Sequence, residues 1–168
     1  MEASFLQRMK AFLIDYLFIL CYIAFLLVVS LFLFPPIRQL FLGPQWLAQL
    51  GGFLLLTLPV ALYFIISDST IGGQSFGKSK MGIKVVGING KSVSVIHMIG
   101  RTILKLLPWE LSHYLVYRLM NIEDVPLHDY VIGSLIYMLV FGNILAATFT
   151  KKKQSLYDII LQTRVIKL

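Results

Sequence analysis

Long apolar runs alternate with short polar segments along the chain, and several of the runs are long enough to cross a bilayer. The first run carries one carboxylate, Asp15, and ends at Pro35 and Pro36. A later run is mostly apolar but includes Glu110 and His113. The pattern predicts an all-α membrane protein with four transmembrane helices in one domain. The expected spans are residues 9–34, 47–67, 102–120 and 130–150.

The third span has an alternative interpretation, because the segment that leads into it is amphipathic. Arg101 and Lys105 lie four residues apart on one face of residues 97–107, and apolar side chains cover much of the rest. A helix of this kind can lie at the membrane surface. Three transmembrane helices plus an interfacial helix is therefore the alternative to four spans. If the helix continues into the membrane, Pro108 is expected to kink it.

A small β element is expected in the polar loop at residues 68–101. The pair Asn89–Gly90 is typical of a tight hairpin turn, and it has strand-like segments on both sides. These segments are residues 83–86 and 93–95. We therefore expect a small cytoplasmic β-hairpin. Residues 163–168 alternate like a strand, so this part of the tail could pair with the hairpin.

The distribution of basic residues predicts the orientation of the chain. Of the 15 lysines and arginines, only Arg38 and Arg118 fall on the side expected to face away from the cytoplasm. The others lie at the opposite ends of the spans, in the loop or in the tail at residues 151–168. This asymmetry follows the positive-inside rule and predicts that both termini are cytoplasmic. It also accounts for the net charge of +7, so we expect no nucleic acid partner.

Asp15 is the first candidate functional residue, because its position in the first span places a carboxylate within the hydrocarbon region. An ionisable group there costs about 3 kcal/mol unless it is paired, hydrated or protonated. Arg8 projects from the same face two helical turns earlier. Such a carboxylate can exchange protons during transport. The alternative interpretation is that Asp15 only ties its helix to neighbouring helices.

Glu110, His113 and Tyr117 form a second candidate cluster. Their spacing of i, i+3 and i+7 places them on one face of the third span. A histidine and a carboxylate on such a face can relay protons. Alternatively, Glu110 and His113 satisfy each other near an interface. His97 and His128 lie outside the spans with no further ligand at a suitable spacing, so we expect no metal site.

Residues 72–79 match the phosphate-binding pattern G-x-x-x-x-G-K-[ST] letter for letter. That pattern binds nucleotides between a strand and a helix, whereas here a membrane span precedes it. We therefore expect no nucleotide and no cofactor, and no hydrolase motif suggests an enzyme. Basic residues beside the spans are expected to contact anionic lipid head groups. These residues are Lys78, Lys80, Lys151, Lys152 and Lys153.

Short motifs recur from end to end of the chain, at residues 7–16, 77–78, 81–86, 89–90, 101, 155–158 and 163–165. Together they resemble the RDD family of small membrane proteins, which is named for one arginine and two aspartates. The resemblance implies that Arg8 is the arginine, Asp15 the first aspartate and Asp158 the second. Members are described as transporters of unknown ligands, and monovalent cation/proton antiport has been proposed for some of them.

The functional expectation is therefore transport of a small solute or monovalent cation coupled to protons. Asp15 would exchange the proton, and Arg8 would either tune Asp15 or pair with Asp158. Because four spans are few for a transporter, a homo-oligomer or a membrane protein partner is expected. Two alternatives stay open, a non-catalytic accessory subunit of a membrane complex and a protein that binds anionic lipid. The expected location, by analogy, is a bacterial cytoplasmic membrane.

Overall fold

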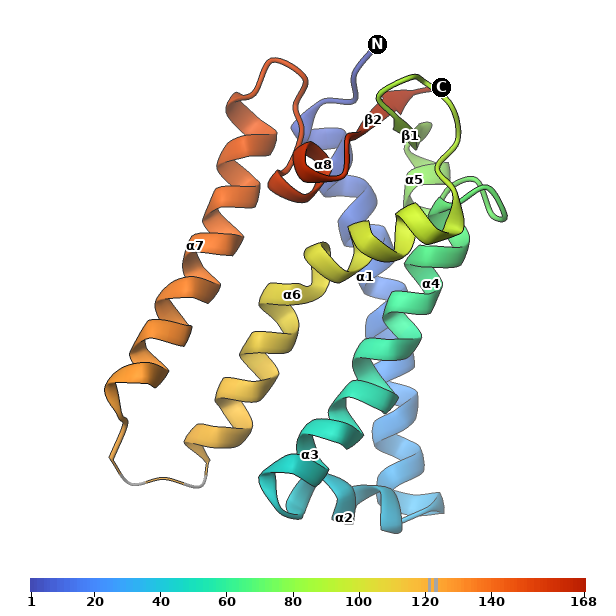
Figure 1. The fold of residues 1–168 in the computed structure, drawn as a ribbon. Helices are drawn as coiled ribbons and strands as arrows, with labels where there is room; N and C mark the ends of the chain where they lie inside the picture. The colour runs from blue at the N-terminus through green and yellow to red at the C-terminus, as the bar shows by residue number, and fades with distance from the viewer. Residues whose placement is uncertain (121, 123) are drawn as a thin grey trace.

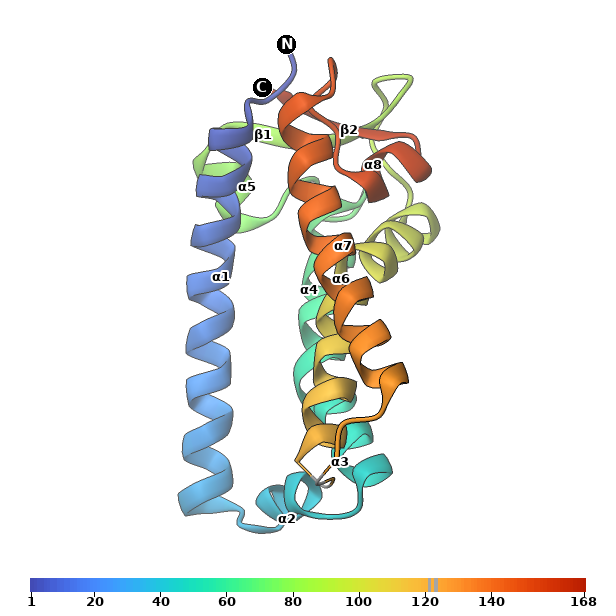
Figure 2. The same cartoon turned by 90° about the vertical axis from the view of Figure 1, so that its left-hand side faces the viewer.

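The computed structural model describes residues 1–120, 122 and 124–168 and consists of long helices with a small sheet at one end (Figure 1). Both termini lie at the sheet end, and short helices α5 and α8 lie beside them (Figures 1 and 2). The elements in chain order are α1 (Phe5–Val28), η1 (Val29–Leu33), α2 (Pro36–Leu42), α3 (Gln45–Gly52), η2 (Phe53–Thr57), α4 (Leu58–Asp68), α5 (Phe76–Lys80), β1 (Ile83–Gly87), α6 (Val95–Leu119), α7 (Leu127–Phe149), α8 (Leu156–Ile160) and β2 (Thr163–Lys167).

The first long helix begins before the expected position at residue 9. Ser4 caps α1 by accepting a hydrogen bond from the backbone N–H of Gln7, and the Gln7 side chain accepts one from Ser4 in return. The helix continues into the π-helical segment η1. Its buried residues Ala11, Asp15 and Ile19 are spaced four apart, so α1 turns one narrow stripe toward the protein.

The segment expected to form only a loop after the first span contains the short helix α2. Pro36 occupies its first turn, where a missing N–H costs nothing because that group would have no partner within the helix. The second expected span is one continuous helical rod made of α3, η2 and α4. The π-helical turn η2 lies in the middle of this rod, directly before Pro59 in the first turn of α4.

Helix α6 combines the two interpretations of the third span. Ser94 caps it by accepting a hydrogen bond from the backbone N–H of His97, so the helix begins well before residue 102. Pro108 lies inside the helix. The first half of α6 runs across the bundle and the second half runs along it (Figure 1). The bend between the two halves is the kink expected at Pro108.

Three helices in the described part of the chain are long and apolar enough to cross a membrane. They are Phe5–Leu33, Gln45–Asp68 and Leu127–Phe149. The membrane-spanning character expected for three of the four spans is therefore confirmed in length and composition. Helix α6 is of comparable length but carries Arg101, Lys105, Glu110 and Arg118, which lower its hydropathy.

The small sheet differs from the expected hairpin in its main partner. Strand β1 pairs antiparallel with β2 from the tail, with Val85 opposite Val165. The tail pairing expected from the alternating pattern is thus confirmed. The hairpin itself is reduced to a single bridge between Val86 and Ser92, because Ser94 caps α6 and residue 95 is already helical. On its other edge β2 contacts the N-terminus through a bridge between Glu2 and Ile166.

The sheet completes a small apolar core at this end of the bundle. The core joins the N-terminal segment, α1, both strands and the start of α6. Its buried members are Ala3, Ala11, Ile83, Val85, Val93, Met98 and Val165. Because these residues lie far apart in the sequence, the core fixes α1 and α6 to the sheet and positions the charged side chains described below.

Candidate functional site

Asp158 in the first turn of α8 is fully buried and is bound by two arginines. The Nε of Arg101 on α6 lies 2.9 Å from one carboxylate oxygen, and the hydroxyl of Thr163 donates to the same oxygen over 2.9 Å. Arg8 on α1 donates to the other oxygen. One carboxylate therefore joins α1, α6, α8 and β2.

Burial raises the pKa of Asp158, but the charges of Arg101 and Arg8 outweigh this effect and hold the pKa below its usual range. Burial likewise opposes the charge on Arg101, and the carboxylate of Asp158 reverses that effect, so the pKa of Arg101 is raised. All three side chains are therefore charged at neutral pH. The cluster is one buried anion shared by two cations.

Arg8 pairs with Asp158, which decides between the two partners considered for it. Its guanidinium also donates to the backbone carbonyl of Lys153 and contacts the hydroxyl of Ser155 over 3.5 Å. These contacts fasten the start of α1 to the segment that precedes α8. Asp15 lies on the same helix as Arg8 but has a different set of partners, on α4 and at the start of α5.

Asp15 is buried and accepts hydrogen bonds from three donors at the start of α5 and on α4. The Ser75 hydroxyl donates over 2.6 Å, the Gly77 backbone N–H over 2.7 Å and the Tyr63 hydroxyl over 2.8 Å. The Tyr63 oxygen also accepts from the backbone N–H of Phe76 over 3.1 Å. This carboxylate therefore fastens α1 to both α4 and α5, as in the alternative interpretation of Asp15.

Gly77 approaches α1 so closely that no side chain fits there. A Cβ at this position would lie 2.1 Å from the backbone oxygen of Ala11 and 2.9 Å from the carboxylate carbon of Asp15. The glycine allows its own N–H to reach Asp15. The contact between α1 and α5 thus depends on backbone meeting backbone.

The segment with the phosphate-binding pattern is used for contacts within the protein. Lys78 forms an ion pair of 2.7 Å with buried Asp68, and its ammonium also lies 3.1 Å from the Ser75 hydroxyl. The segment follows helix α4 and contains only the five-residue helix α5, unlike the strand–loop–helix that cradles phosphate. Lys78 therefore faces the protein interior, which differs from the lipid contact expected for it.

The other lysines expected at the lipid surface are more exposed. Lys80, Lys151 and Lys152 are exposed, whereas Lys153 is half-buried and donates to the carbonyl of Thr148 over 2.6 Å. Their lipid contacts stay a prediction.

A small cavity of about 70 Å³ lies between the Asp15 and Asp158 contacts. Charged side chains from both contacts line it, together with Lys105 from α6. The Lys105 ammonium lies over the ring of Phe64, 3.1 Å from its centroid. Among the described residues, no carboxylate lies within ion-pair distance of Lys105. The Lys105 amine is therefore not held in an ion pair within the described part of the chain.

Glu110 forms a separate polar cluster in the second half of α6. Its carboxylate accepts hydrogen bonds of 2.6 Å from the Gln49 amide and 2.6 Å from the Thr57 hydroxyl, on α3 and η2. His113 lies on the same face, with Nδ1 3.9 Å from Glu110. Tyr117 follows on this face, and its ring lies 6.2 Å from the ring of His113. The sequence therefore placed Glu110 and His113 correctly on one face.

Two polar atoms in this cluster are buried without a hydrogen-bond partner among the described residues. They are Oε1 of Gln49 and Nδ1 of His113. The Glu110 side chain remains 27% exposed, so the cluster is not sealed. It combines a carboxylate, an amide oxygen and an imidazole nitrogen without partners, and the π-helical turn η2, a combination suited to a proton or a small cation.

Sequence reasoning missed several partners that complete these contacts. Tyr63 and Ser75 at Asp15, and Gln49 and Thr57 at Glu110, are uncharged residues in or beside an apolar span, where polarity is their only signal. Arg101 was recognised as part of an amphipathic face and of the family motifs, but not as a partner of Asp158. Its charge at the start of an expected span was the available signal for a buried ion pair.

Replacing Tyr63 by phenylalanine is expected to lower the free energy of unfolding by about 2 kcal/mol, because the buried carboxylate of Asp15 loses one of its three hydrogen-bond donors. The measurement is detergent-induced unfolding of the purified protein. Tyr137→Phe is the matched control, since Tyr137 is exposed on α7 and contacts Phe141 only through its ring. Equal stability of Tyr63→Phe and the control would contradict the role of the hydroxyl.

Among the comparisons with known proteins, a family model matches this chain. Searches of curated proteins and of solved structures found no match. The family model for the RDD family matches residues 2–162, which is nearly the whole chain and includes Arg8, Asp15 and Asp158. With three helices apolar and long enough to cross a bilayer, the chain is a membrane protein that belongs to the RDD family.

Proposed function

We propose that this protein crosses a bacterial cytoplasmic membrane four times and exchanges a monovalent cation for a proton. Helix α6 is the fourth crossing in this arrangement, because its second half runs along the bundle beside the apolar helices (Figure 1). The gathering of basic residues at the end that carries both termini supports a cytoplasmic location for that end.

The observation that carries the exchange proposal is the cluster around Glu110. Burying a carboxylate within a membrane helix costs free energy, so such a group is a candidate functional residue. Glu110 has hydrogen-bond donors on α3 and η2, and two polar atoms without partners lie in the same cluster. A small cation could bind between Glu110 and Oε1 of Gln49, displacing a proton from the carboxylate. His113 could pass that proton along the same face of α6.

Glu110 is a better carrier than Asp15, because the two carboxylates differ in how they are bound. Asp15 is only 1% exposed and has three protein donors, one of them a backbone N–H. A group that exchanges ions must change partners during each cycle. Glu110 is more accessible and its partners are side chains, so we assign the exchange to Glu110 and a fastening role to Asp15.

Glu110→Gln is expected to reduce cation-driven proton flux to the level of protein-free liposomes, because glutamine cannot release a proton. The assay adds sodium, lithium or potassium outside liposomes that contain only this protein and follows the internal pH with a dye. Glu2→Gln makes the same chemical change outside the bundle, where Glu2 contacts Arg164, and should retain the native flux.

Three other outcomes would argue against this assignment. If Glu110→Gln transports normally and folded Asp15→Asn does not, the exchanging carboxylate is Asp15. If neither variant differs from an active native protein, the exchanged proton uses neither group. If the native protein moves no protons in any assembly state, including the homo-oligomer that a four-helix transporter would need, the transport proposal fails and an accessory role in a membrane complex takes its place.

A further inference from the structure

A larger groove lies on the other side of Lys105, between α1, α6, α7 and the segment around α8. It has a volume of about 480 Å³, enough for a substantial part of an acyl chain. We propose that this groove holds one anionic phospholipid, with its phosphate on Lys105 and an acyl chain along the apolar wall. The proposal is independent of ion exchange at Glu110, because Glu110 does not line the groove.

Apolar side chains from three helices form most of the wall. Helices α1 and α7 provide opposite sides and α6 closes the space between them. The principal apolar residues are Phe5, Met9 and Phe12 on α1, Trp109 on α6, and Val140 and Ile144 on α7. Because α1 and α7 are both apolar enough to cross a membrane, this wall lies where acyl chains are available.

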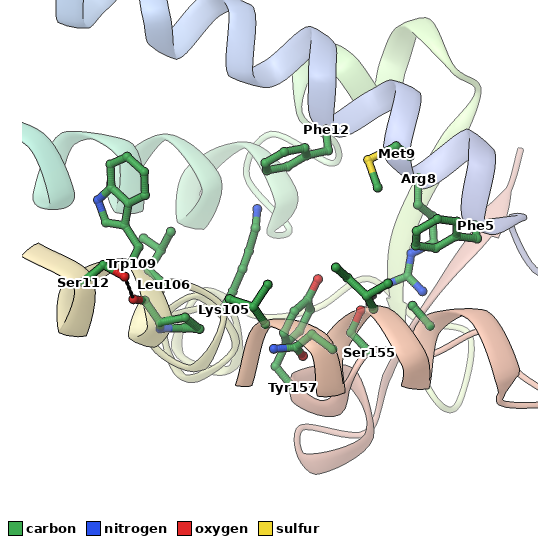
Figure 3. Close-up of a pocket in the computed structure, with 15 residues that line it drawn as sticks. Phe5, Arg8, Met9, Phe12, Lys105, Leu106, Trp109, Ser112, Ser155 and Tyr157 are labelled. Carbon is green, nitrogen blue, oxygen red and sulfur yellow. Dashed lines mark hydrogen bonds between the residues drawn. The ribbon is translucent and has the colours of Figure 1, made fainter. Parts of the chain in front are cut away.

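Lys105 provides the charge that a phosphate would meet. Its side chain lines the groove and extends from α6 toward Phe12 of α1, with the ammonium end beside the ring of Phe64 (Figure 3). The Tyr157 hydroxyl points into the same space (Figure 3). No described carboxylate lines the groove, and Asp158 beside it is already bound by two arginines, one of which, Arg8, lines the groove. An anion in the groove would therefore give the Lys105 ammonium an ion-pair partner.

The combination of wall and charge selects an anionic lipid over other occupants. A zwitterionic lipid such as phosphatidylcholine would fill the wall, but its choline cation offsets the charge of the phosphate offered to Lys105. A soluble anion would neutralise Lys105 but leave the apolar wall uncovered. The groove also lies at the end of the bundle where basic residues gather, and basic pockets between membrane helices on that side bind acidic head groups.

Quenching of Trp109 by brominated lipids tests the proposal directly, because Trp109 lines the groove. The chain has only two tryptophans, so Trp46→Phe leaves Trp109 as the single reporter. This variant would be placed in vesicles that contain increasing fractions of brominated phosphatidylglycerol or brominated phosphatidylcholine with identical chains. The fraction of brominated lipid that gives half-maximal quenching is expected to be about fivefold lower for phosphatidylglycerol than for phosphatidylcholine. A difference of this size corresponds to about 1 kcal/mol, the contribution of one lysine near an acidic head group.

Three further variants show which residues the lipid preference depends on. Lys105→Gln should remove the difference between the two lipids, whereas Lys151→Gln, which changes an exposed lysine outside the groove, should retain it. Val140→Phe narrows the groove without changing its charge and should weaken quenching by both lipids. Retention of native far-ultraviolet circular dichroism shows that each variant is folded.

Several results would overturn the proposal. Equal quenching by the two brominated lipids would show that the groove does not select an acidic head group. A preference that survives Lys105→Gln but disappears in Lys151→Gln would assign lipid selection to the exposed lysines instead. Loss of the quenching preference on adding inorganic phosphate alone would indicate a site for the free ion.

Discussion

Gly77→Ala is expected to destabilise the protein by about 3 kcal/mol, at the upper end of the usual cost of overpacking. The added methyl group would lie 2.1 Å from the backbone oxygen of Ala11, so α1 and α5 must separate. That separation also pulls the Gly77 N–H away from Asp15, which is buried and would lose one of its three donors. The measurement is the free energy of unfolding by titration with denaturing detergent in mixed micelles.

Gly133→Ala provides the matched control on α7. A Cβ at Gly133 would meet only a methyl group of Leu115 at 3.7 Å, an ordinary contact distance. We expect a change within about 1 kcal/mol, the range set by the helix propensities of the two residues. If Gly77→Ala and Gly133→Ala unfold at the same detergent fraction, the close contact between α1 and α5 does not contribute to stability.

Asp158→Asn is expected to cost about 4 kcal/mol, because removing the shared anion leaves buried Arg101 and half-buried Arg8 without a counter-ion. Arg101 is almost completely buried and cannot lose its proton, so it cannot escape this cost by becoming neutral. The same unfolding titration measures the effect. Asp124→Asn makes the same chemical change at an exposed position and should leave stability within about 0.5 kcal/mol of native.

A double variant and a pH series separate charge pairing from a general loss of packing. Adding Arg101→Gln to Asp158→Asn should cost less than the sum of the two single variants, because each removes the same interaction. The lowered pKa of Asp158 means that its stabilising effect is complete above the usual carboxyl range. The effect is lost as pH falls through the lowered value, so native protein and Asp158→Asn should converge in acid.

The roles of the three family residues illustrate how far sequence reasoning extends. Spacing along the first helix correctly placed Arg8 and Asp15 on the same side, two turns apart. It did not decide their partners, because Arg8 meets Asp158 across 150 positions and Asp15 meets Gly77 across 62. Such contacts depend on how α5 and α8 fold back onto α1, which no local pattern encodes.

In the small sheet, too, local sequence predicted the strands but not how they pair. Alternating residues predicted strands near residues 83–86 and in the tail, and both strands are present. The predicted hairpin partner was wrong, because local turn signals cannot weigh a distant strand against a nearby helix cap. Ser94 starts α6, so the hairpin ends after the single bridge at Ser92, and the tail strand β2 pairs along the opposite edge of β1.

The sequence alone determined the membrane class of this protein, the approximate positions of its long helices and which carboxylates fall within the expected spans, because hydropathy and helical periodicity are local properties of the chain. Tertiary structure decided which charges pair, that Lys105 has no carboxylate partner in the described part of the chain, and that a groove lies beside it. Those features arise where α1, α6, α7 and α8 meet, since a counter-ion or a cavity wall can come from any element that packs against the residue.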